Sequence, residues 1–269
     1  MKIVVPVKQV AALDDEFELL DDGAGVDPDF VERDLNEWDA FSLEAALQLA
    51  EAVGESEVVA VSVGDEEAAE GLLTCLAKGA DRGVRVWDDA LEDADVLSVA
   101  RVLAAAVERE SPDLVLCGVQ SSDAVNGATG IALAAHLGLP HVAVVSGLEL
   151  DAGSGTATVE RELEGGLIEV LKIRCPALLT IQTGANEPRY ATLRAIKQAR
   201  AKPLEAVSLG ELGLDADTVA LAAGSRVRTL APPAKGGGAE MLSGSPADVA
   251  ARIAEICLLY TSPSPRDRS

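Results

Sequence analysis

The stretch from Gly118 to Gly130 (loop 118–130) is the part of the sequence best suited to bind a ligand. It contains the glycines Gly118 and Gly127. Its side chains that donate or accept hydrogen bonds are those of Gln120, Ser121, Ser122, Asp123, Asn126 and Thr129. Small residues let backbone N–H groups approach a phosphate, and a helix that begins after such a loop adds a favourable dipole. The stretch holds no lysine and neither a GxxxxGK(S/T) nor a GxGxxG pattern. A monophosphate held by amides and hydroxyls therefore fits better than a triphosphate, and an ordinary loop with capping residues is the alternative.

Motifs for covalent catalysis are missing from the sequence. Neither His136 nor His141 has a serine or cysteine partner in a nucleophile motif, and no G-x-S-x-G occurs. The cysteines are far apart in the sequence and, with only two histidines, cannot form a Cys/His zinc cluster. We therefore predict no catalytic residue and no metal ligand.

The stretch Asn186–Pro203 concentrates positive charge in an otherwise acidic chain. Against the single acid Glu187 it carries Arg189, Arg194, Lys197, Arg200 and Lys202. Three of these cations, at positions 194, 197 and 200, are spaced to share one helical face, beside Leu193 and Ile196. This face is either simply solvated or a docking surface that presents an apolar residue among cations.

Trp38 stands out because aromatic residues make up only 3% of the chain. It lies in the polar stretch Asn36–Asp39, which we expect to precede the first long helix. The indole either covers the core or stacks on a planar ligand.

Apolar runs and helical spacings alternate through the first half of the chain. We expect strands at 2–7, 57–63, 84–87 and 113–117, helices over 43–50, 65–77 and 96–109, and a polar loop at 11–35. This order predicts an α/β fold with a doubly wound, mostly parallel, Rossmann-like sheet. Ligands of such sheets bind beyond the carboxyl ends of the strands, which selects Pro6–Lys8, Val63–Asp65 and the segment from Gly118 onward.

The second half is rich in β runs, at 142–150, 156–163, 167–173 and 178–181, whose spacing predicts a meander. A helix at 192–202, a Gly/Pro-rich arm at 231–246 and an amphipathic helix at 246–256 follow. We predict one domain over 1–230, with its β-rich part and basic stretch at about 140–205, and a C-terminal arm with its helix at 231–257. Residues 258–269 are rich in Ser, Pro and Arg, unlike the rest, and we predict a non-native or disordered tail there.

Composition excludes several classes of partner. A net charge of −23 makes most of the surface repel nucleic acid and anionic membranes. No stretch approaches the roughly 20 apolar residues of a membrane helix, and the N-terminus lacks the pattern of a signal peptide. The sequence therefore predicts a cytoplasmic protein that binds no nucleic acid and does not insert into a membrane.

Taken together, these stretches resemble the β subunit of electron transfer flavoprotein, from Met1 to about Ile256. The opening KIVVPVKQV is similar to the family's first strand and turn, and the turn Ala77–Gly83 adds support. The family's signature region is matched in order by Val159–Glu169, Pro176–Thr180 and Asn186–Tyr190.

The resemblance implies a heterodimer with an electron transfer flavoprotein α subunit, which makes most of the FAD contacts, while this chain buries AMP without a catalytic role. The AMP contacts it implies are Pro6, Asn36, Glu37, Trp38, Asp39, Val63, Gly118, Gln120, Ser121, Ser122, Asp123, Asn126, Gly127, Ala128 and Thr129. Trp38 would also lie near the FAD, as would Leu13, at a position that is often aromatic in the family. The arm and helix at 231–257 would embrace the α subunit.

The resemblance also implies that the basic stretch docks on partner dehydrogenases. Leu193 matches the family's anchoring leucine, and the residues around it are Glu187, Arg189, Tyr190, Arg194, Ile196 and Lys197. Electrons would pass from acyl-CoA dehydrogenase-type flavoenzymes to the FAD and then to a membrane quinone reductase, as in fatty acid oxidation.

Three other functions compete with this interpretation. Some relatives bind a second FAD in the β subunit and bifurcate electrons, and their nucleotide-binding loop is more acidic. In this chain residues 123–126 are Asp-Ala-Val-Asn, which favours AMP. A stand-alone nucleotide-binding stress or regulatory protein would use the same architecture. An ATP-consuming ligase of related fold is disfavoured because the sequence has no phosphate-gripping lysine motif.

Overall fold

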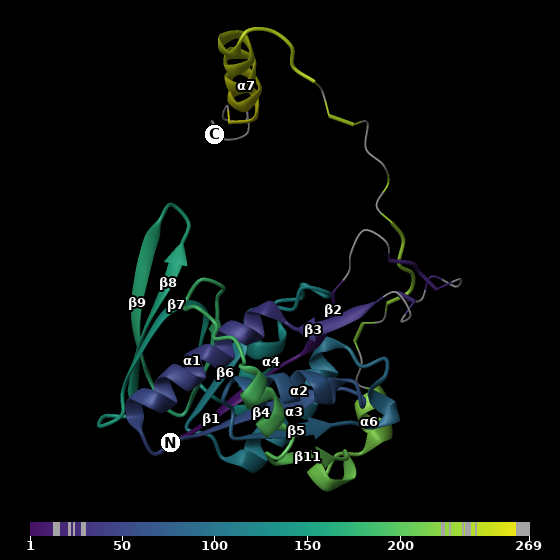
Figure 1. Cartoon of the computed structure of the whole chain (residues 1–269), viewed down its shortest axis with the longest axis vertical. Coiled ribbons are helices and arrows are strands. Elements are labelled where there is room, and N and C mark those ends of the chain that lie inside the picture. The colour runs from purple at the N-terminus through teal and green to yellow at the C-terminus, as the bar shows by residue number, and fades with distance from the viewer. Residues whose placement is uncertain are drawn as a thin grey trace. The chain divides into compact units, whose positions relative to one another are not determined.

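Two units make up the chain, Met1–Leu230 and Ala231–Ser269 (Figure 1). The computed structural model describes residues 1–12, 17–20, 23, 25–27, 31–221, 224–225, 227–232, 234, 238–239 and 241–261. The first unit contains the β-sheets, and the second contains helix α7 (Pro246–Thr261). Leu13, expected near the FAD, lies outside the described residues.

A nine-stranded sheet forms the centre of the first unit. Its strands are β1 (Lys2–Pro6), β4 (Glu57–Val63), β5 (Arg82–Val86), β6 (Leu114–Gly118), β7 (His141–Asp151), β8 (Thr156–Leu163), β9 (Leu167–Arg174), β10 (Ala177–Ile181) and β11 (Leu204–Val207). They are arranged in the order β11-β5-β4-β1-β6-β10-β7-β8-β9, in which all pairs from β11 to β7 are parallel. The pairs β7–β8 and β8–β9 are antiparallel.

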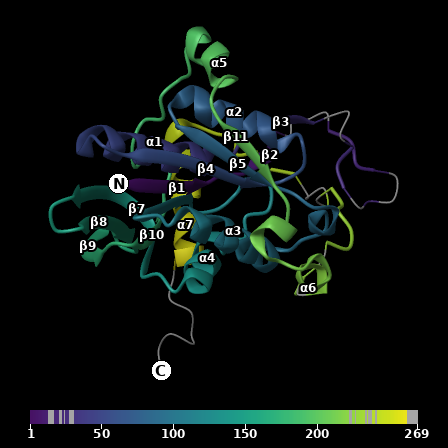
Figure 2. The same cartoon turned by 90° about the horizontal axis from the view of Figure 1, so that it is seen from below.

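Helices cover both faces of this sheet (Figure 2). Those that cover it are α1 (Glu37–Val53), α2 (Ala68–Lys78), α3 (Val96–Glu110) and α4 (Thr129–Leu137). The short helices α5 (Leu193–Ala199) and α6 (Ala216–Leu221) lie further out, α5 against α2 and α6 against the turn Asp89–Leu91. Leu43 of α1 and Leu72 of α2 belong to the core on one face, and Leu103 of α3 and Leu133 of α4 to the core on the other. The predicted doubly wound, Rossmann-like α/β fold is therefore confirmed. Within the described part of the chain, no helix combines the length and apolar character of a membrane span.

The composition of the strands explains their positions. Ile3, Val4 and Val5 of β1 are fully buried because neighbouring side chains of this strand point to opposite faces, and each face carries helices. In β8, by contrast, Ala157 and Val159 are buried while Glu160 is exposed, which is the alternation expected for a strand with one solvent-facing side.

The order of the strands reverses between β1 and β6. After β1 the chain adds β4 and then β5 on one side of it, and it later returns to place β6 on the other side. The carboxyl ends of β1 and β6 thus lie next to each other where the chain changes direction, and we call this place the switch point. In open α/β sheets this is where ligands bind.

Two predictions about strands are wrong, and one strand was not foreseen. The run at 178–181 does not extend the meander, because β10 pairs in parallel with both β6 and β7. The predicted loop at 11–35 contains strand β3 (Glu32–Leu35), which pairs antiparallel with β2 (Gln9–Ala12). Strand β11 was not predicted; it adds to the edge of the sheet beside β5.

Two helix boundaries also differ from the predictions. Helix α1 begins at Glu37, so Trp38 lies in its first turn and not in a loop before it. Helix α7 continues to Thr261, whereas we expected disorder from residue 258; residues 262–269 lie outside the described part.

Gly130 should be intolerant of substitution because α4 packs closely on the sheet there. A Cβ atom on Gly130 would lie 2.6 Å from Thr180 Cγ2 and 2.7 Å from Cys117 Sγ. We expect Gly130→Ala to lower the free energy of unfolding by about 1 to 3 kcal/mol, measured by urea denaturation. Gly210→Ala is the control, since nothing lies within 4 Å of its Cβ position. Equal stability of the two variants would contradict this packing argument.

Candidate functional site

Two buried polar side chains at the start of α1 connect the strand ends at the switch point. Asn36 is 1% exposed; its side chain donates to the carbonyl of Gln120 (2.8 Å) and accepts from the backbone N–H of Ser122 (3.2 Å). Asp39 is 6% exposed and accepts from the backbone N–H groups of Lys8 (2.7 Å) and Gly118 (3.2 Å). The first turn of α1 therefore fixes the backbone that follows both β1 and β6.

Burial has a marked effect on the charge state of Asp39. Loss of water around the carboxyl raises its pKa to about 7, against the opposing effect of hydrogen bonds from Lys8, Asn36 and Gly118. The group therefore titrates near neutral pH.

Lys8 lies in the range Pro6–Lys8 that the strand ends select, although the AMP contacts implied by the resemblance do not include it. Its ammonium group donates to both carboxylate oxygens of Asp123, at 2.8 and 2.6 Å. Burial acts to raise the pKa of Asp123, but the hydrogen bond from Lys8 outweighs it and the pKa is lowered. Loop 118–130 thus has a lysine beside it that comes from the opposite side of the switch point. Its position directly after a strand places Lys8 at this edge of the sheet, but the sequence does not indicate its pairing with Asp123.

Most of the predicted AMP contacts lie at this edge of the sheet. Pro6 and Val63 end the paired strands β1 and β4, and Gly118 ends β6. Among the described residues, four side chains of loop 118–130 make no hydrogen bond to protein: Gln120, Ser122, Asn126 and Thr129. These amide and hydroxyl groups remain available to a polar ligand. Asn36 and Asp39, by contrast, are largely occupied by backbone groups.

Trp38 is held by a residue that the sequence argument missed. Its indole N–H lies 3.3 Å from Oε1 of Gln182, which directly follows β10. Because β10 is inserted next to β6, Gln182 comes close to the first turn of α1. The half-buried indole therefore has a defined orientation at the switch point.

The stretch Asn186–Pro203, which we call the docking segment, is tied to the body by two of its five cations. Arg189 forms ion pairs with Glu44 and Glu51 of α1 at 2.8 and 2.6 Å. Burial acts to raise the pKa of Glu44, but hydrogen bonds from Arg189 outweigh it and lower the pKa. Lys202 donates to the carbonyls of Leu76 and Ala80 at the end of α2. Arg189, which the resemblance groups with the partner contacts, makes contacts that brace the segment.

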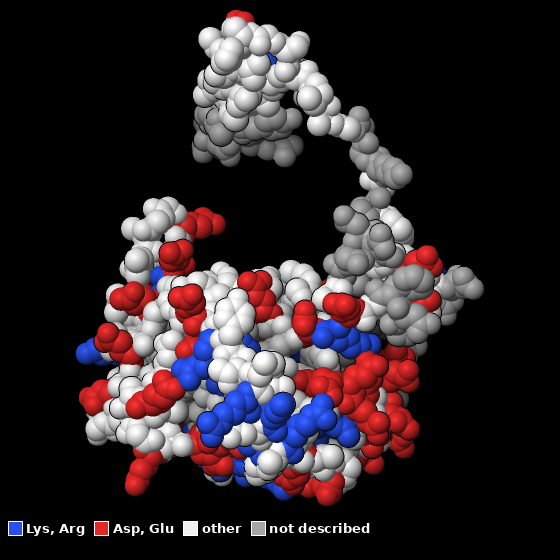
Figure 3. Space-filling view, viewed as in Figure 1, with Lys and Arg blue, Asp and Glu red and all other residues white. Residues whose placement is uncertain are grey.

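Between these two cations, much of the docking segment faces solvent. Tyr190 is 95% exposed, Leu193 is 81% exposed and Ile196 is 47% exposed. Helix α5 lies at the periphery, packed against α2 (Figure 2). Lys and Arg side chains gather in the middle of the face seen in Figure 3, with acidic side chains around them. An exposed apolar group surrounded by cations is suited to a partner surface that is apolar at its centre and acidic at its rim.

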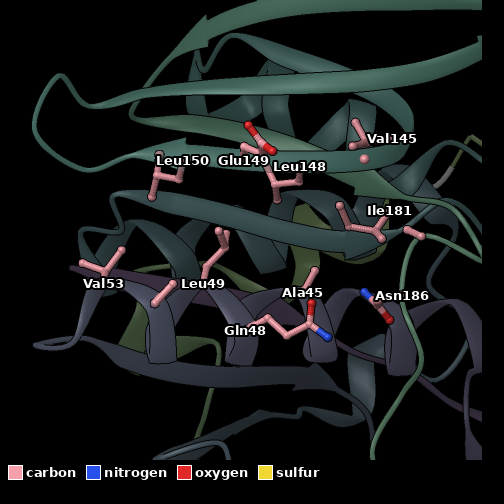
Figure 4. Close-up of a pocket in the computed structure, with 13 residues that line it drawn as sticks. Ala45, Gln48, Leu49, Val53, Val145, Leu148, Glu149, Leu150, Ile181 and Asn186 are labelled. Carbon is pink, nitrogen blue, oxygen red and sulfur yellow. The ribbon is translucent and has the colours of Figure 1, made fainter.

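A groove of about 330 Å³ lies between α1 and β7 (Figure 4). Leu49 and Val53 of the helix line one side, and Leu148 and Leu150 of the strand line the other. None of the predicted AMP contacts lines this groove, so it is distinct from the switch point.

The doubly wound sheet, with polar residues gathered at its switch point, defines an α/β protein of the Rossmann-like class. A family model described as the electron transfer flavoprotein domain matches residues 27–212. The electron transfer flavoprotein subunit beta of Methylophilus methylotrophus is 52% identical over 258 residues, covering 95% of this chain and 97% of that protein. The chain therefore belongs to the electron transfer flavoprotein β-subunit family, as the resemblance predicted.

More distant relatives agree with this assignment. The electron transfer flavoprotein subunit beta of Bradyrhizobium diazoefficiens is 37% identical over 215 residues, and the human protein of that name is 38% identical over 217 residues. Each match covers 80% of this chain and 84% of the relative.

The raised pKa of Asp39 predicts a pH-dependent stability. Between the usual aspartate value of 3.8 and the folded value of about 7, the folded state binds a proton that the unfolded state has lost. This contribution to stability is complete below pH 3.8 and is lost as the pH rises to about 7. We expect the stability of the wild type relative to Asp39→Asn to fall by roughly 1 to 3 kcal/mol between about pH 5 and pH 8, measured by urea denaturation. A difference that stays constant over this range would contradict the raised pKa.

Proposed function

We propose that this chain is the β subunit of a cytoplasmic heterodimeric electron transfer flavoprotein that binds AMP as a structural component. FAD, bound chiefly by the α subunit, would supply the redox chemistry of the complex. The complex would accept electrons from acyl-CoA and related dehydrogenases and pass them to a membrane quinone reductase. The chain itself would have no catalytic residue.

The observation that supports AMP binding most directly is the polar arrangement at the switch point. Asn36 and Asp39 hold the backbone after β1 and β6, and the free side chains of loop 118–130 are amides and hydroxyls. Such groups bind ribose and a phosphate of low charge without a metal ion. A ligand held by preformed backbone geometry can stabilise the fold, because it binds the folded state alone.

Trp38 supports a flavin contact at the same end of the sheet. It is half-buried, and its hydrogen bond with Gln182 limits rotation of the indole. A fixed aromatic face can pack against the ring system of a flavin held by another subunit.

The docking segment supports contact with dehydrogenases. Arg189 fixes its beginning and Lys202 its end, so Leu193 projects from a braced support. An exposed apolar side chain that is already positioned loses little conformational entropy when a partner covers it.

Co-expression with an α subunit of the same family tests the assignment. We expect a yellow complex that contains one FAD and one AMP per heterodimer, and a colourless β subunit when it is purified alone. Absorbance measures the flavin, and chromatography of the supernatant after denaturation measures AMP. Two flavins per heterodimer would identify the bifurcating type instead, and a stable homodimer without need of an α subunit would support the stand-alone alternative.

Leu193→Ala tests the docking segment. We expect electron uptake from an acyl-CoA dehydrogenase to become about tenfold slower, as is typical of a central apolar anchor, because the partner loses a buried contact. Flavin content should stay unchanged, and the measurement is stopped-flow reduction of the complex. Leu97→Ala, at another exposed leucine (51%), is the control. Flavin loss in Leu193→Ala would show that this side chain is structural.

A further inference from the structure

The function proposed above assigns no role to Lys8 or to its ion pair with Asp123, although Asp123 itself is among the implied AMP contacts. Lys8 lies just after β1, and Asp123 lies in the loop after β6, 115 residues further along the chain. Because β1 and β6 are neighbours at the switch point, the pair connects the two sides of the place where ligands of such sheets bind.

Loop 118–130 consists of two parts with different support. Its inner part, 118–122, is fixed by hydrogen bonds from the first turn of α1, through Asn36 and Asp39. Its outer part, 123–127, is exposed throughout, and the space around Gly127 is open. Among the described residues, Lys8 supplies the hydrogen bonds that tie this outer part to a segment outside the loop.

We propose that Lys8 is a positioning residue for the mononucleotide: acting through Asp123, it holds the outer part of loop 118–130 toward β1 and slows the loss of the nucleotide. This inference rests on the proposed AMP site. The side chains of the pair are 46% and 30% exposed, so the pair can open without disturbing the core.

The two partners of the pair have unequal effects. Removing Lys8 releases the outer part of the loop and also leaves the carboxylate of Asp123 unneutralised near a phosphate, which repels it. Removing the charge of Asp123 releases the loop but leaves a free ammonium group that can attract the phosphate. Loss of Lys8 should therefore accelerate nucleotide release more than loss of Asp123.

The experiment measures AMP release from the purified heterodimer after dilution into nucleotide-free buffer. Filtrates taken over time are analysed by chromatography, and flavin absorbance is followed in parallel. We expect release to be about tenfold faster in Lys8→Met and about threefold faster in Asp123→Asn, the range expected for a partly exposed ion pair and one added repulsion. Flavin content should not change. Raising the salt concentration should shrink both differences, since it screens exposed charges.

Three variants make the test specific. Lys8→Arg keeps the charge and should retain AMP nearly as the wild type does. Exchange of the two residues, Lys8→Asp with Asp123→Lys, should restore most of the retention. Lys172→Met makes the same chemical change at an exposed cation of β9 and should leave release unchanged.

Equal release rates in the wild type, Lys8→Met and Asp123→Asn, with AMP present in all three, would overturn the role of the pair and leave the AMP site in place. A wild-type heterodimer that carries FAD but no AMP would overturn the proposed AMP site itself, and the role of Lys8 with it. If Lys8→Met does not assemble, Asp123→Asn and the exchanged pair, which retain a lysine, still decide between these outcomes.

Discussion

The structure of the candidate site depends on the buried polar connection made by the first turn of α1. Asn36 and Asp39 are almost completely removed from water, and their side chains bind backbone groups that follow β1 and β6. Burying a carboxylate costs free energy unless its oxygens are hydrogen bonded, and each backbone N–H that Asp39 accepts offsets part of this cost. The same bonds fix the position of two strand ends that are distant in sequence. The geometry of the switch point is therefore present before a ligand binds.

Cations have a particular importance in a chain with a net charge of −23. Arg189 pairs with Glu44 and Glu51, and Lys8 pairs with Asp123, so each of these cations connects segments far apart in the sequence. Exposed ion pairs contribute little to stability, but Glu44 is nearly buried, and breaking its pair with Arg189 would leave a poorly solvated charge. These cations thus fix the positions of loops, while Arg194 and Lys197 on α5 stay exposed and can interact with another protein.

The sequence was sufficient to predict the central strands and their helices, because fully apolar runs such as Ile3–Val5 have only one stable environment in an α/β protein. The place of β10 could not be predicted, because its apolar run fits a meander and a parallel insertion equally well. The ion pair of Lys8 with Asp123 could not be predicted for a similar reason. Its partner Asp123 is 115 residues away, and only the pairing order of β1 and β6 brings the two together. Both the place of β10 and the partner of Lys8 depend on which strands pair with each other. The local sequence pattern of a strand carries little information about its pairing partners.

Helix α1 relates the two candidate regions to each other. Its first turn holds the switch point through Asp39 and carries Trp38, while Glu44 in its middle and Glu51 in its last turn hold the docking segment. An α-helix rises about 1.5 Å per residue and bends little over such a length, so it keeps the distance between these positions nearly constant. In the proposed function, a partner dehydrogenase docks at one end of this support and the flavin lies near the other. The buried carboxylates of Asp39 and Glu44 attach this rigid helix to the switch point and to the docking segment. The helix would therefore keep the distance between the docked dehydrogenase and the flavin the same each time a complex forms.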